Sequence, residues 1–362
     1  MRNQPGGIEL LLEGWISPKP PVVLFVQGGR CETLTAPVER FDNALADGYV
    51  GHFDGQFFSG FPNLGARHAM NRRDLLQSFP MLAAFGSSSI LSADARSKPG
   101  ARLRTAICAY SFREALKKKT MTYDDLVRLA VELDVDGLDL TVYWFPNTSD
   151  EFLLPLRRLA YKHGVEIYSI SIRSDMCRPT EDLRDREVAW LERWVEVAAK
   201  LGAGHIRVFG GDVPKGSTED QATEWVISTL ERASEYSGSR GVILGLENHG
   251  GITSRAEKVV QIVKAVNSPW VGINLDTGNF ESNTYAQIEA CVPYAVNVQF
   301  KTEIRENGKK LPSDWNRILT MLSKGGYKGY LALEYEADEA SEVAVPRLTK
   351  QLNDAVRIQD RG

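Results

Sequence analysis

Four oxygen-bearing side chains lie near the ends of four successive strand-like runs in the second half of the sequence. They are Glu247 in VILGLE, Asp276 in VGINLD, Gln299 in NVQF and Glu334 in YLALE. If these strands stand side by side in a parallel barrel, the four side chains converge at its carboxyl-terminal mouth, where barrel enzymes carry out their chemistry. We therefore predict that they are the ligands of a metal-dependent enzyme.

Three carboxylates and one amide oxygen form an all-oxygen set, which suits a hard divalent cation. Mn²⁺ is the first choice and Mg²⁺ the second; Ca²⁺ is less suitable, and zinc or copper would favour imidazole or thiolate ligands. A single acidic residue at a strand end is most often solvated or caps a helix. Glu247 and Glu334, however, end the apolar segments LGLE and LALE, where an unpaired charge would be costly to bury.

The elements that position these residues alternate regularly from Arg104 onward. Eight strand-like runs, each followed by an amphipathic helical run, repeat at a spacing of roughly 25 to 37 residues, which is the count and period of a closed (β/α)8 TIM barrel. An open doubly wound sheet is the alternative, but no Gly-rich nucleotide-binding turn follows the first strand. The strand-like runs are TAICAYSF, GLDLTVYWF, VEIYSISI, HIRVFGG, VILGLENH, VGINLDTGN, NVQFKTEI and GYLALEYE.

Helix ends are marked by residues with capping preferences. Gly164, Gly202 and Gly241 directly follow helical runs and are predicted to adopt left-handed carboxyl-terminal caps. The predicted amino-terminal caps are Thr120, Ser254 and Ser313.

The composition is that of an ordinary globular protein, and it limits the classes of partner that the chain is expected to bind. With 43% hydrophobic residues, 25% charged residues and a net charge of −4, the chain offers no electrostatic reason to bind nucleic acid. The four cysteines are scattered without a C-x-x-C pair, so neither a disulfide framework nor a structural zinc site is indicated. A homo-oligomer is compatible with the sequence.

A segment that starts at Met70 has the order of a secretory signal. The pair Arg72 and Arg73 precedes a moderately apolar stretch and an Ala-Asp-Ala cleavage site that ends at Ala95, as in a twin-arginine export signal. This predicts export to the periplasm by the twin-arginine machinery, with residues 96–362 as the mature barrel. The stretch is too short and polar for stable membrane insertion.

Because export signals work from the start of a chain, residues 1–69 are expected to come from an upstream, mistranslated start and to have no native fold. Their repeated Gly and Pro interrupt the one strand-like run, VVLFV. The competing hypothesis is a genuine small domain at 1–69 followed by a buried helix at 74–91.

Four motifs together resemble the sugar phosphate isomerase/epimerase superfamily with its xylose isomerase-like TIM barrels. They are LENHGG, NLDTGNF, NVQFK and LALEYE, and the likeness spans about 104–355. The resemblance implies a ligand set of Glu, Asp, His and Glu on strands five to eight, at the positions of Glu247, Asp276, Gln299 and Glu334. Two departures stand out: Gln299 replaces a histidine, and Asn279 occupies the place of a histidine that contacts substrate.

The implied reaction is proton abstraction next to a carbonyl of a sugar. A divalent ion would stabilise the enediolate as a Lewis acid, and Glu247 and Glu334 would exchange protons with the substrate. Because both departures remove an imidazole, elimination from 3-keto-glycosides is the alternative to isomerisation or epimerisation. In that reaction His249 would assist the leaving group as an acid.

Other residues of the predicted mouth are candidates for binding the sugar. Arg207 and Lys301 have the parity of inward-facing residues and could either clamp the substrate or balance the carboxylates. Tyr143 and Trp144 end the second strand and could stack on a sugar ring. By contrast, His163 and His205 fall at the opposite end of the barrel and are interpreted as structural.

The sequence favours a non-phosphorylated substrate. The loops after the last two strands, where barrels often bind phosphate, read TEIRENGKK and YEADEAS, and the second is strongly acidic. Two other classes compete with the isomerase. A nuclease of this superfamily would need several histidines and a basic groove, which the chain lacks, whereas Gln299 and Asn279 leave a non-catalytic carbohydrate-binding barrel open.

Overall fold

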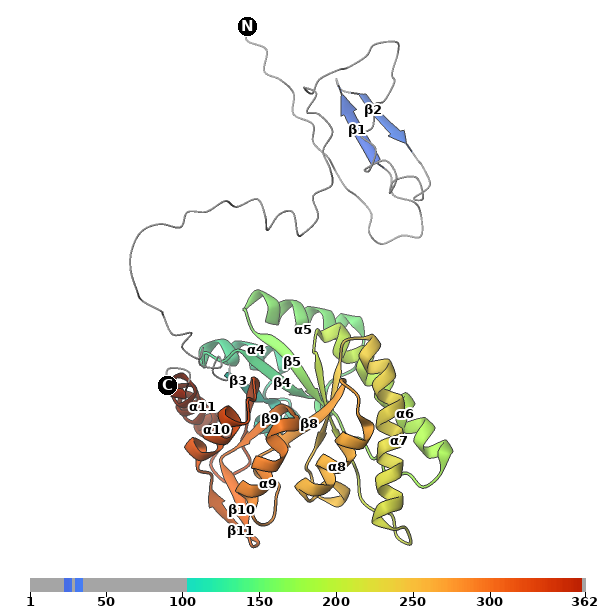
Figure 1. The fold of residues 1–362 in the computed structure, drawn as a ribbon. Coiled ribbons are helices and arrows are strands. Elements are labelled where there is room, and N and C mark those ends of the chain that lie inside the picture. The colour runs from blue at the N-terminus through green and yellow to red at the C-terminus, as the bar shows by residue number, and fades with distance from the viewer. Residues whose placement is uncertain (1–22, 28–29, 35–102, 360–362) are drawn as a thin grey trace, which may run out of the picture. The chain divides into compact units, whose positions relative to one another are not determined.

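A computed structural model describes residues 23–27, 30–34 and 103–359 (Figure 1). The first two segments form an antiparallel pair of strands, β1 (Val23–Gln27) and β2 (Arg30–Leu34). This hairpin includes most of the strand-like run VVLFV. The rest of the expected upstream extension and the whole expected export signal at 70–95 lie outside the described residues.

Eight parallel strands close into a barrel between residues 103 and 334, which confirms the predicted TIM barrel. Each strand pairs with its neighbours along the chain, and the last, β12, pairs with the first, β3. The strands are β3 (Leu103–Cys108), β4 (Gly137–Thr141), β5 (Glu166–Ser171), β6 (His205–Phe209), β7 (Ile243–Glu247), β8 (Val271–Asp276), β9 (Ala295–Lys301) and β12 (Gly329–Glu334).

The barrel strands are short, and most of their residues are buried. Every residue of β4 and β8 is buried, as expected for parallel strands covered by helices outside and by side chains within. Polar residues in such strands can therefore only face the barrel interior or its mouth.

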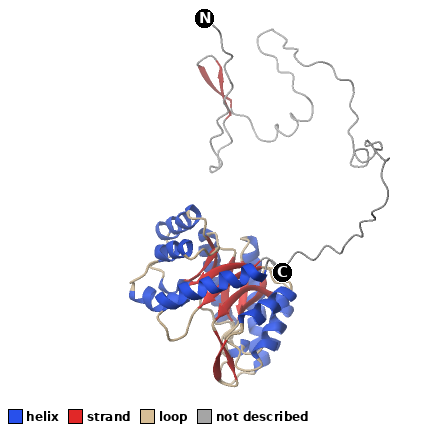
Figure 2. Ribbon diagram, turned by 90° about the vertical axis from the view of Figure 1, so that its left-hand side faces the viewer, coloured by secondary structure: helices blue, strands red, loops and turns tan. Residues whose placement is uncertain are grey.

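Helices surround the barrel, as Figures 1 and 2 show. The main helices are α4 (Tyr123–Glu132), α5 (Asp150–Lys162), α6 (Glu181–Leu201), α7 (Glu219–Ser239), α8 (Ala256–Val266), α9 (Thr284–Cys291), α10 (Trp315–Lys324) and α11 (Ser341–Gln359). A short helix, α3 (Arg113–Lys118), and 3-10 turns occupy some of the connections. Each of the eight predicted strand–helix units is present.

The predicted carboxyl-terminal caps are confirmed, whereas the amino-terminal caps are displaced. Gly164, Gly202 and Gly241 all have positive φ, between 69° and 81°, a conformation that costs glycine little.

The prediction of Thr120, Ser254 and Ser313 as amino-terminal caps is wrong by one or two residues: the caps are Thr122, Arg255 and Asp314. At Thr122 a reciprocal capping box with Asp125 fixes the start of α4.

After β9 the chain forms a hairpin, where the sequence predicted a continuing strand and a loop. Residues Glu303–Glu306 (β10) and Lys309–Pro312 (β11) form an antiparallel hairpin between β9 and α10. The hairpin projects from the barrel in Figures 1 and 2. Its turn contains Asn307 and Gly308, both with positive φ, as a tight hairpin turn requires.

Among the helices of the described segments, none is both long and apolar enough to cross a membrane.

Candidate active site

The four residues singled out in the sequence come together at the carboxyl-terminal mouth of the barrel. Glu247, Asp276 and Glu334 are the last residues of β7, β8 and β12, and Gln299 lies in β9 directly opposite Asp276. All four are at least 95% buried. The four strands β7, β8, β9 and β12 are consecutive in the barrel, so these residues lie along one half of the wall.

A cavity of about 330 Å³ opens above these residues, within the roughly 300–1,000 Å³ range of small-molecule sites. Its walls combine acidic, basic and aromatic side chains from most of the strands. They are Tyr110, Tyr143, Arg173, Arg207, Phe209, Glu247, His249, Asp276, Asn279, Lys301, Arg305, Glu334 and Glu336.

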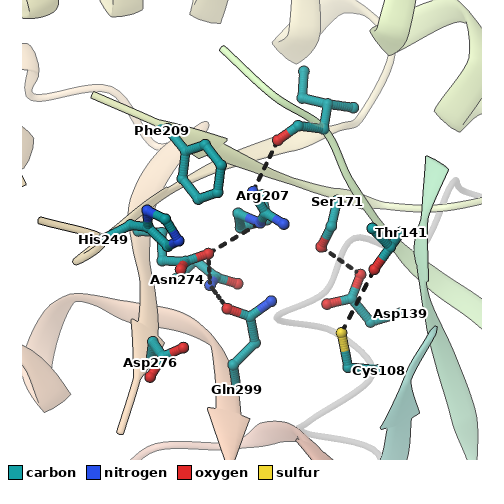
Figure 3. A network of polar contacts seen from close by, with 12 residues as sticks. Cys108, Asp139, Thr141, Ser171, Arg207, Phe209, His249, Asn274, Asp276 and Gln299 are labelled. Carbon is teal, nitrogen blue, oxygen red and sulfur yellow. Dashed lines mark hydrogen bonds and ion pairs between the residues drawn. The ribbon is translucent and has the colours of Figure 1, made fainter. Parts of the chain in front are cut away.

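Arg207 is held on one side of the cavity by a buried ion pair. Its Nε lies 3.0 Å from Oε2 of Glu247, and its Nη1 donates to the carbonyl oxygen of Ile172 at 2.9 Å. Figure 3 shows Arg207 beside the ring of Phe209, and its guanidinium carbon lies 4.0 Å from the centroid of that ring. Arg207 therefore balances the charge of Glu247 while it also lines the cavity.

Lys301 occupies the other side and contacts three carboxylates. Its ammonium lies 3.3 Å from Oδ2 of Asp276 and 3.0 Å from Oε2 of Glu334, and it also donates to Glu336. The two cations predicted to face inward both do so, and both pair with acidic residues.

Gln299 is oriented by an amide network below the cavity. Its Oε1 accepts a hydrogen bond from Nδ2 of Asn274 at 2.9 Å, and Asn274 in turn accepts one from Asn297. Gln299 itself does not reach the cavity wall, and its Nε2 is buried without a hydrogen-bond partner.

These residues fit a hard divalent cation in their chemistry. Three carboxylates and an amide oxygen are within one neighbourhood, and the buried Oδ2 of Asp276 makes no hydrogen bond, its nearest cation being the Lys301 ammonium at 3.3 Å. The buried carboxylates also outnumber Arg207 and Lys301.

In the arrangement seen here each of the three carboxylates contacts one of these cations. Within the described residues no three His, Cys, Asp or Glu side chains are grouped closely enough to hold an ion.

Burial raises the pKa of two acidic residues of the cavity, Asp276 and Glu247. It raises the pKa of Asp276 to about 7, against the opposing charge of Lys301. It also raises the pKa of Glu247 well above its usual value, although Arg207 acts in the opposite direction. Perturbed carboxyls gathered in one cavity are typical of sites that move protons.

His249 lies beyond β7 and lines the cavity, with its ring centroid 4.1 Å from that of Phe209. Burial lowers its pKa, so the imidazole is neutral at pH 7. Asn279 also lines the cavity and donates from Nδ2 to Oε1 of Glu247 at 3.2 Å.

Of the two aromatic candidates, Tyr143 lines both this cavity and a neighbouring one, whereas Trp144 lines the neighbouring one.

The two histidines interpreted as structural lie away from the cavity. His205 begins β6, is buried, and its Nδ1 lies 2.8 Å from the hydroxyl of Ser169. Burial lowers its pKa to about 3. His163 is exposed and caps the carboxyl end of α5.

Three further residues of the site were missed in the sequence. Asp139 is fully buried in β4, accepts from Ser171, and its pKa is raised by burial to about 6. In the sequence, Asp139 is an acidic residue inside the apolar run GLDLT, just as Glu247 is an acidic residue in the apolar run LGLE. Asn274 in INLD carried a similar signal, while Glu336 follows Glu334 at the spacing that keeps both on one face.

Comparison with known proteins places the chain in a family. The family model for a xylose isomerase-like TIM barrel matches residues 127–357. A curated relative, the alpha subunit of a 3'-dehydrocarminate deglycosidase from Microbacterium sp., is 23% identical over 185 residues, 48% of this chain and 49% of that protein. The chain thus spans about half the length of this relative.

Solved structures share the fold at low identity. D-psicose 3-epimerase from Clostridium cellulolyticum H10 is 17% identical with a TM-score of 0.56, covering 71% of this chain and 98% of that one. A probable 3-DHS dehydratase from Bacillus anthracis is 16% identical with a TM-score of 0.56, and the match covers 69% of this chain and 98% of that one.

A third neighbour, the IOLI protein with a bound zinc atom, is 14% identical with a TM-score of 0.57, and the match covers 71% of this chain and 98% of that one. The activities named for these proteins are those of enzymes, and they differ from one protein to the next. The family match covers more than half of the chain and agrees with the closed barrel and with the motifs LENHGG, NLDTGNF, NVQFK and LALEYE: the protein belongs to the xylose isomerase-like TIM barrel family.

Proposed function

We propose that the protein is an enzyme that removes a proton next to the carbonyl of a non-phosphorylated sugar or sugar derivative, as an isomerase or epimerase. One observation carries this proposal: Glu247 and Glu334 line the same cavity as the cations Arg207 and Lys301. Two carboxylates can exchange protons with a bound sugar, and two cations can stabilise the oxygen on which charge develops.

In the proton transfer, the electron pair of the broken C–H bond stays in the substrate. A carboxylate oxygen of Glu334 or Glu247 takes the proton, the C–H electron pair forms a carbon–carbon double bond, and the carbonyl oxygen becomes anionic. The nearby ammonium of Lys301 and guanidinium of Arg207 favour that anion. The raised pKa of Glu247, caused by its burial, suits a group that takes up a proton and returns it to the other face or a neighbouring atom.

We also propose that Glu247, Asp276, Gln299 and Glu334 hold one Mn²⁺ or Mg²⁺ ion. Such an ion would supply a Lewis acid for the carbonyl oxygen. Calorimetric titration of the chelator-treated full chain with MnCl₂ tests this directly. Asp276→Asn should weaken binding about 100-fold or more, whereas Asp182→Asn, on the exposed first turn of α6, should not. Equal affinities in the two variants would rule out this ligand set.

Elimination from a 3-keto-glycoside is the second candidate. It begins with the same proton removal, and the similarity to a deglycosidase of a 3'-dehydro compound supports it. The neutral His249 is better suited to accept a proton than to donate one. Under this alternative a protonated carboxyl of the cavity, rather than His249, would assist the leaving group.

Deuterium exchange tests the shared step. The full chain with Mn²⁺ would be incubated in D₂O with free ketoses, aldoses and 3-keto-glycosides, and carbon-bound deuterium measured by NMR. We expect uptake at one position, abolished by Glu334→Gln and kept by Glu114→Gln, whose carboxylate lies exposed on α3. Release of an aglycone would select elimination, whereas sugar binding without any exchange would favour a carbohydrate-binding barrel and overturn the proposal.

A further inference from the structure

A second cavity adjoins the candidate active site on the side of β4 and β5. It measures about 480 Å³ and is lined by Val142, Tyr143, Trp144, Arg173, Trp190 and Trp194. Tyr143 and Arg173 line both this indole cavity and the catalytic cavity. A molecule that fills the catalytic cavity could therefore continue past these two residues into the indole cavity.

The aromatic walls of the indole cavity are held in place by specific contacts. The rings of Trp190 and Trp194, one helical turn apart on α6, meet edge to face with centroids 5.7 Å apart. The indole N–H of Trp190 donates to the carbonyl oxygen of Arg173 at 3.0 Å. Tyr143 and Trp144 also meet edge to face at 5.7 Å, and the Arg173 guanidinium lies 4.5 Å from the Tyr143 ring centroid.

The chemistry of these walls favours a flat, apolar occupant. Three indole rings and a phenol offer faces and edges for aromatic contact. A second sugar ring would need partners for its hydroxyl groups, but no carboxylate or carboxamide side chain lines the cavity, and the N–H of Trp190 is already bonded. Arg173 adds one positive charge at the boundary, which would favour an anionic substituent on the ring.

We propose that the indole cavity binds a planar aromatic group joined to the sugar in the catalytic cavity, so that the substrate is an aryl-substituted sugar. This inference rests on the proposed function, because it assumes that the catalytic cavity accepts the sugar. Tyr143 and Arg173 would contact the junction between the two parts. Trp190 and Trp194 would contact the aromatic part alone and act as specificity-determining residues.

Binding rather than turnover provides the test. Phenyl β-D-glucoside, 4-carboxyphenyl β-D-glucoside and methyl β-D-glucoside would be titrated into the full chain by calorimetry. We expect the phenyl compound to bind roughly 2- to 12-fold more tightly per aromatic contact than the methyl compound, and the carboxyphenyl compound more tightly still. The preference for the aryl compounds should fall in Trp190→Leu and partly recover in Trp190→Phe, which keeps a ring.

Matched variants separate the subsite from general damage. Trp194→Leu should also lower the preference, whereas Tyr161→Ala, which removes an 86% exposed aromatic from α5, should not. Arg173→Met should lower the affinity for the carboxyphenyl compound more than that for the phenyl compound. Circular dichroism would select the variants that fold. Retention of the full phenyl preference by folded Trp190→Leu, Trp190→Phe and Trp194→Leu would overturn the proposal.

The test also distinguishes failure of the proposed function from failure of the subsite. Aryl preference without deuterium exchange would reject the catalytic proposal but retain an aromatic subsite. Exchange without aryl preference would reject only the subsite. If light scattering instead showed that the Trp190 and Trp194 variants lose a subunit while any preference is unchanged, the aromatic wall would be a contact between protein chains and the proposal would be wrong.

Discussion

Replacing Asp139 by Asn should stabilise the folded protein above pH 6. The carboxyl is fully buried in β4 and accepts a hydrogen bond from Ser171 through Oδ1, while its Oδ2 has no hydrogen-bond partner. Burial raises its pKa from 3.8 to about 6, although Arg207 and Ser171 favour the charged form. The ionised group is thus less stable in the folded chain than in the unfolded one.

The magnitude follows from that shift. A difference of about two pKa units corresponds to about 3 kcal/mol. The sign is set by the raised pKa: the favourable contribution is full below about pH 4 and is lost as pH rises through about 6. An asparagine keeps an acceptor for Ser171 and cannot ionise, but its buried NH₂ lacks a partner and costs about 1 kcal/mol. The net gain above pH 6 should be about 2 kcal/mol.

Urea unfolding of both proteins at pH 5 and pH 8, with a chelator present, measures the effect. The free energy of unfolding of Asp139→Asn minus that of the wild type should increase by about 1.5 kcal/mol between the two pH values. Asp124→Asn, an exposed position on the first turn of α4, should show no such increase. The reasoning is refuted if the difference between Asp139→Asn and wild type is the same at both pH values, or decreases toward pH 8.

Three other predictions concern the remaining contacts. Arg207→Met leaves Glu247 buried without its cation and should cost about 3–5 kcal/mol; Glu247→Gln in the same chain should recover part of it, measured as a double-mutant cycle in urea. His249→Gln should change deuterium exchange by less than about threefold, because the proposed proton transfer uses the carboxylates of Glu247 and Glu334; a loss of about 100-fold, the size expected for a group that transfers the proton itself, would contradict this. Thr122→Ala should cost about 1 kcal/mol through loss of the capping box, whereas Thr120→Ala should cost less.

The barrel was readable from the sequence because its signals are local and repeated. Buried parallel strands leave continuous apolar runs, and helices outside the barrel leave a 3.6-residue period, so both patterns survive without knowledge of the partners. The positions of Glu247, Asp276 and Glu334 at the mouth followed from a related rule, because an acid at the end of a buried apolar strand is costly to bury unless it faces a polar site. Asp139, an acid inside the apolar run GLDLT, shows that the same reasoning applies to an acid within a strand as well as to one at its end.

Cap positions and side-chain pairing depend on contacts that the sequence does not display. Thr122 rather than Thr120 caps α4, because only Thr122 has an acid three residues later, at Asp125, to close the capping box. In the 3-10 turn after β4, Tyr143 lines both cavities whereas Trp144 lines the indole cavity, a difference that the sequence does not display. Likewise, the contact of Lys301 with three carboxylates needs the closed barrel, because β9 must lie between β8 and β12.

Gln299 stands where the family resemblance implies a histidine, and an amide at this position affects how the site handles protons. An amide neither gains nor loses a proton near neutral pH, so the protonation state of the buried mouth depends on its carboxyls. Those carboxyls are crowded, and burial raises the pKa of Asp276 to about 7. Arg207 and Lys301 hold positive charge throughout this range, since the pKa of each is raised by its carboxylate partners despite burial. We therefore expect protons at this mouth to be carried by its carboxyl groups and not by residue 299.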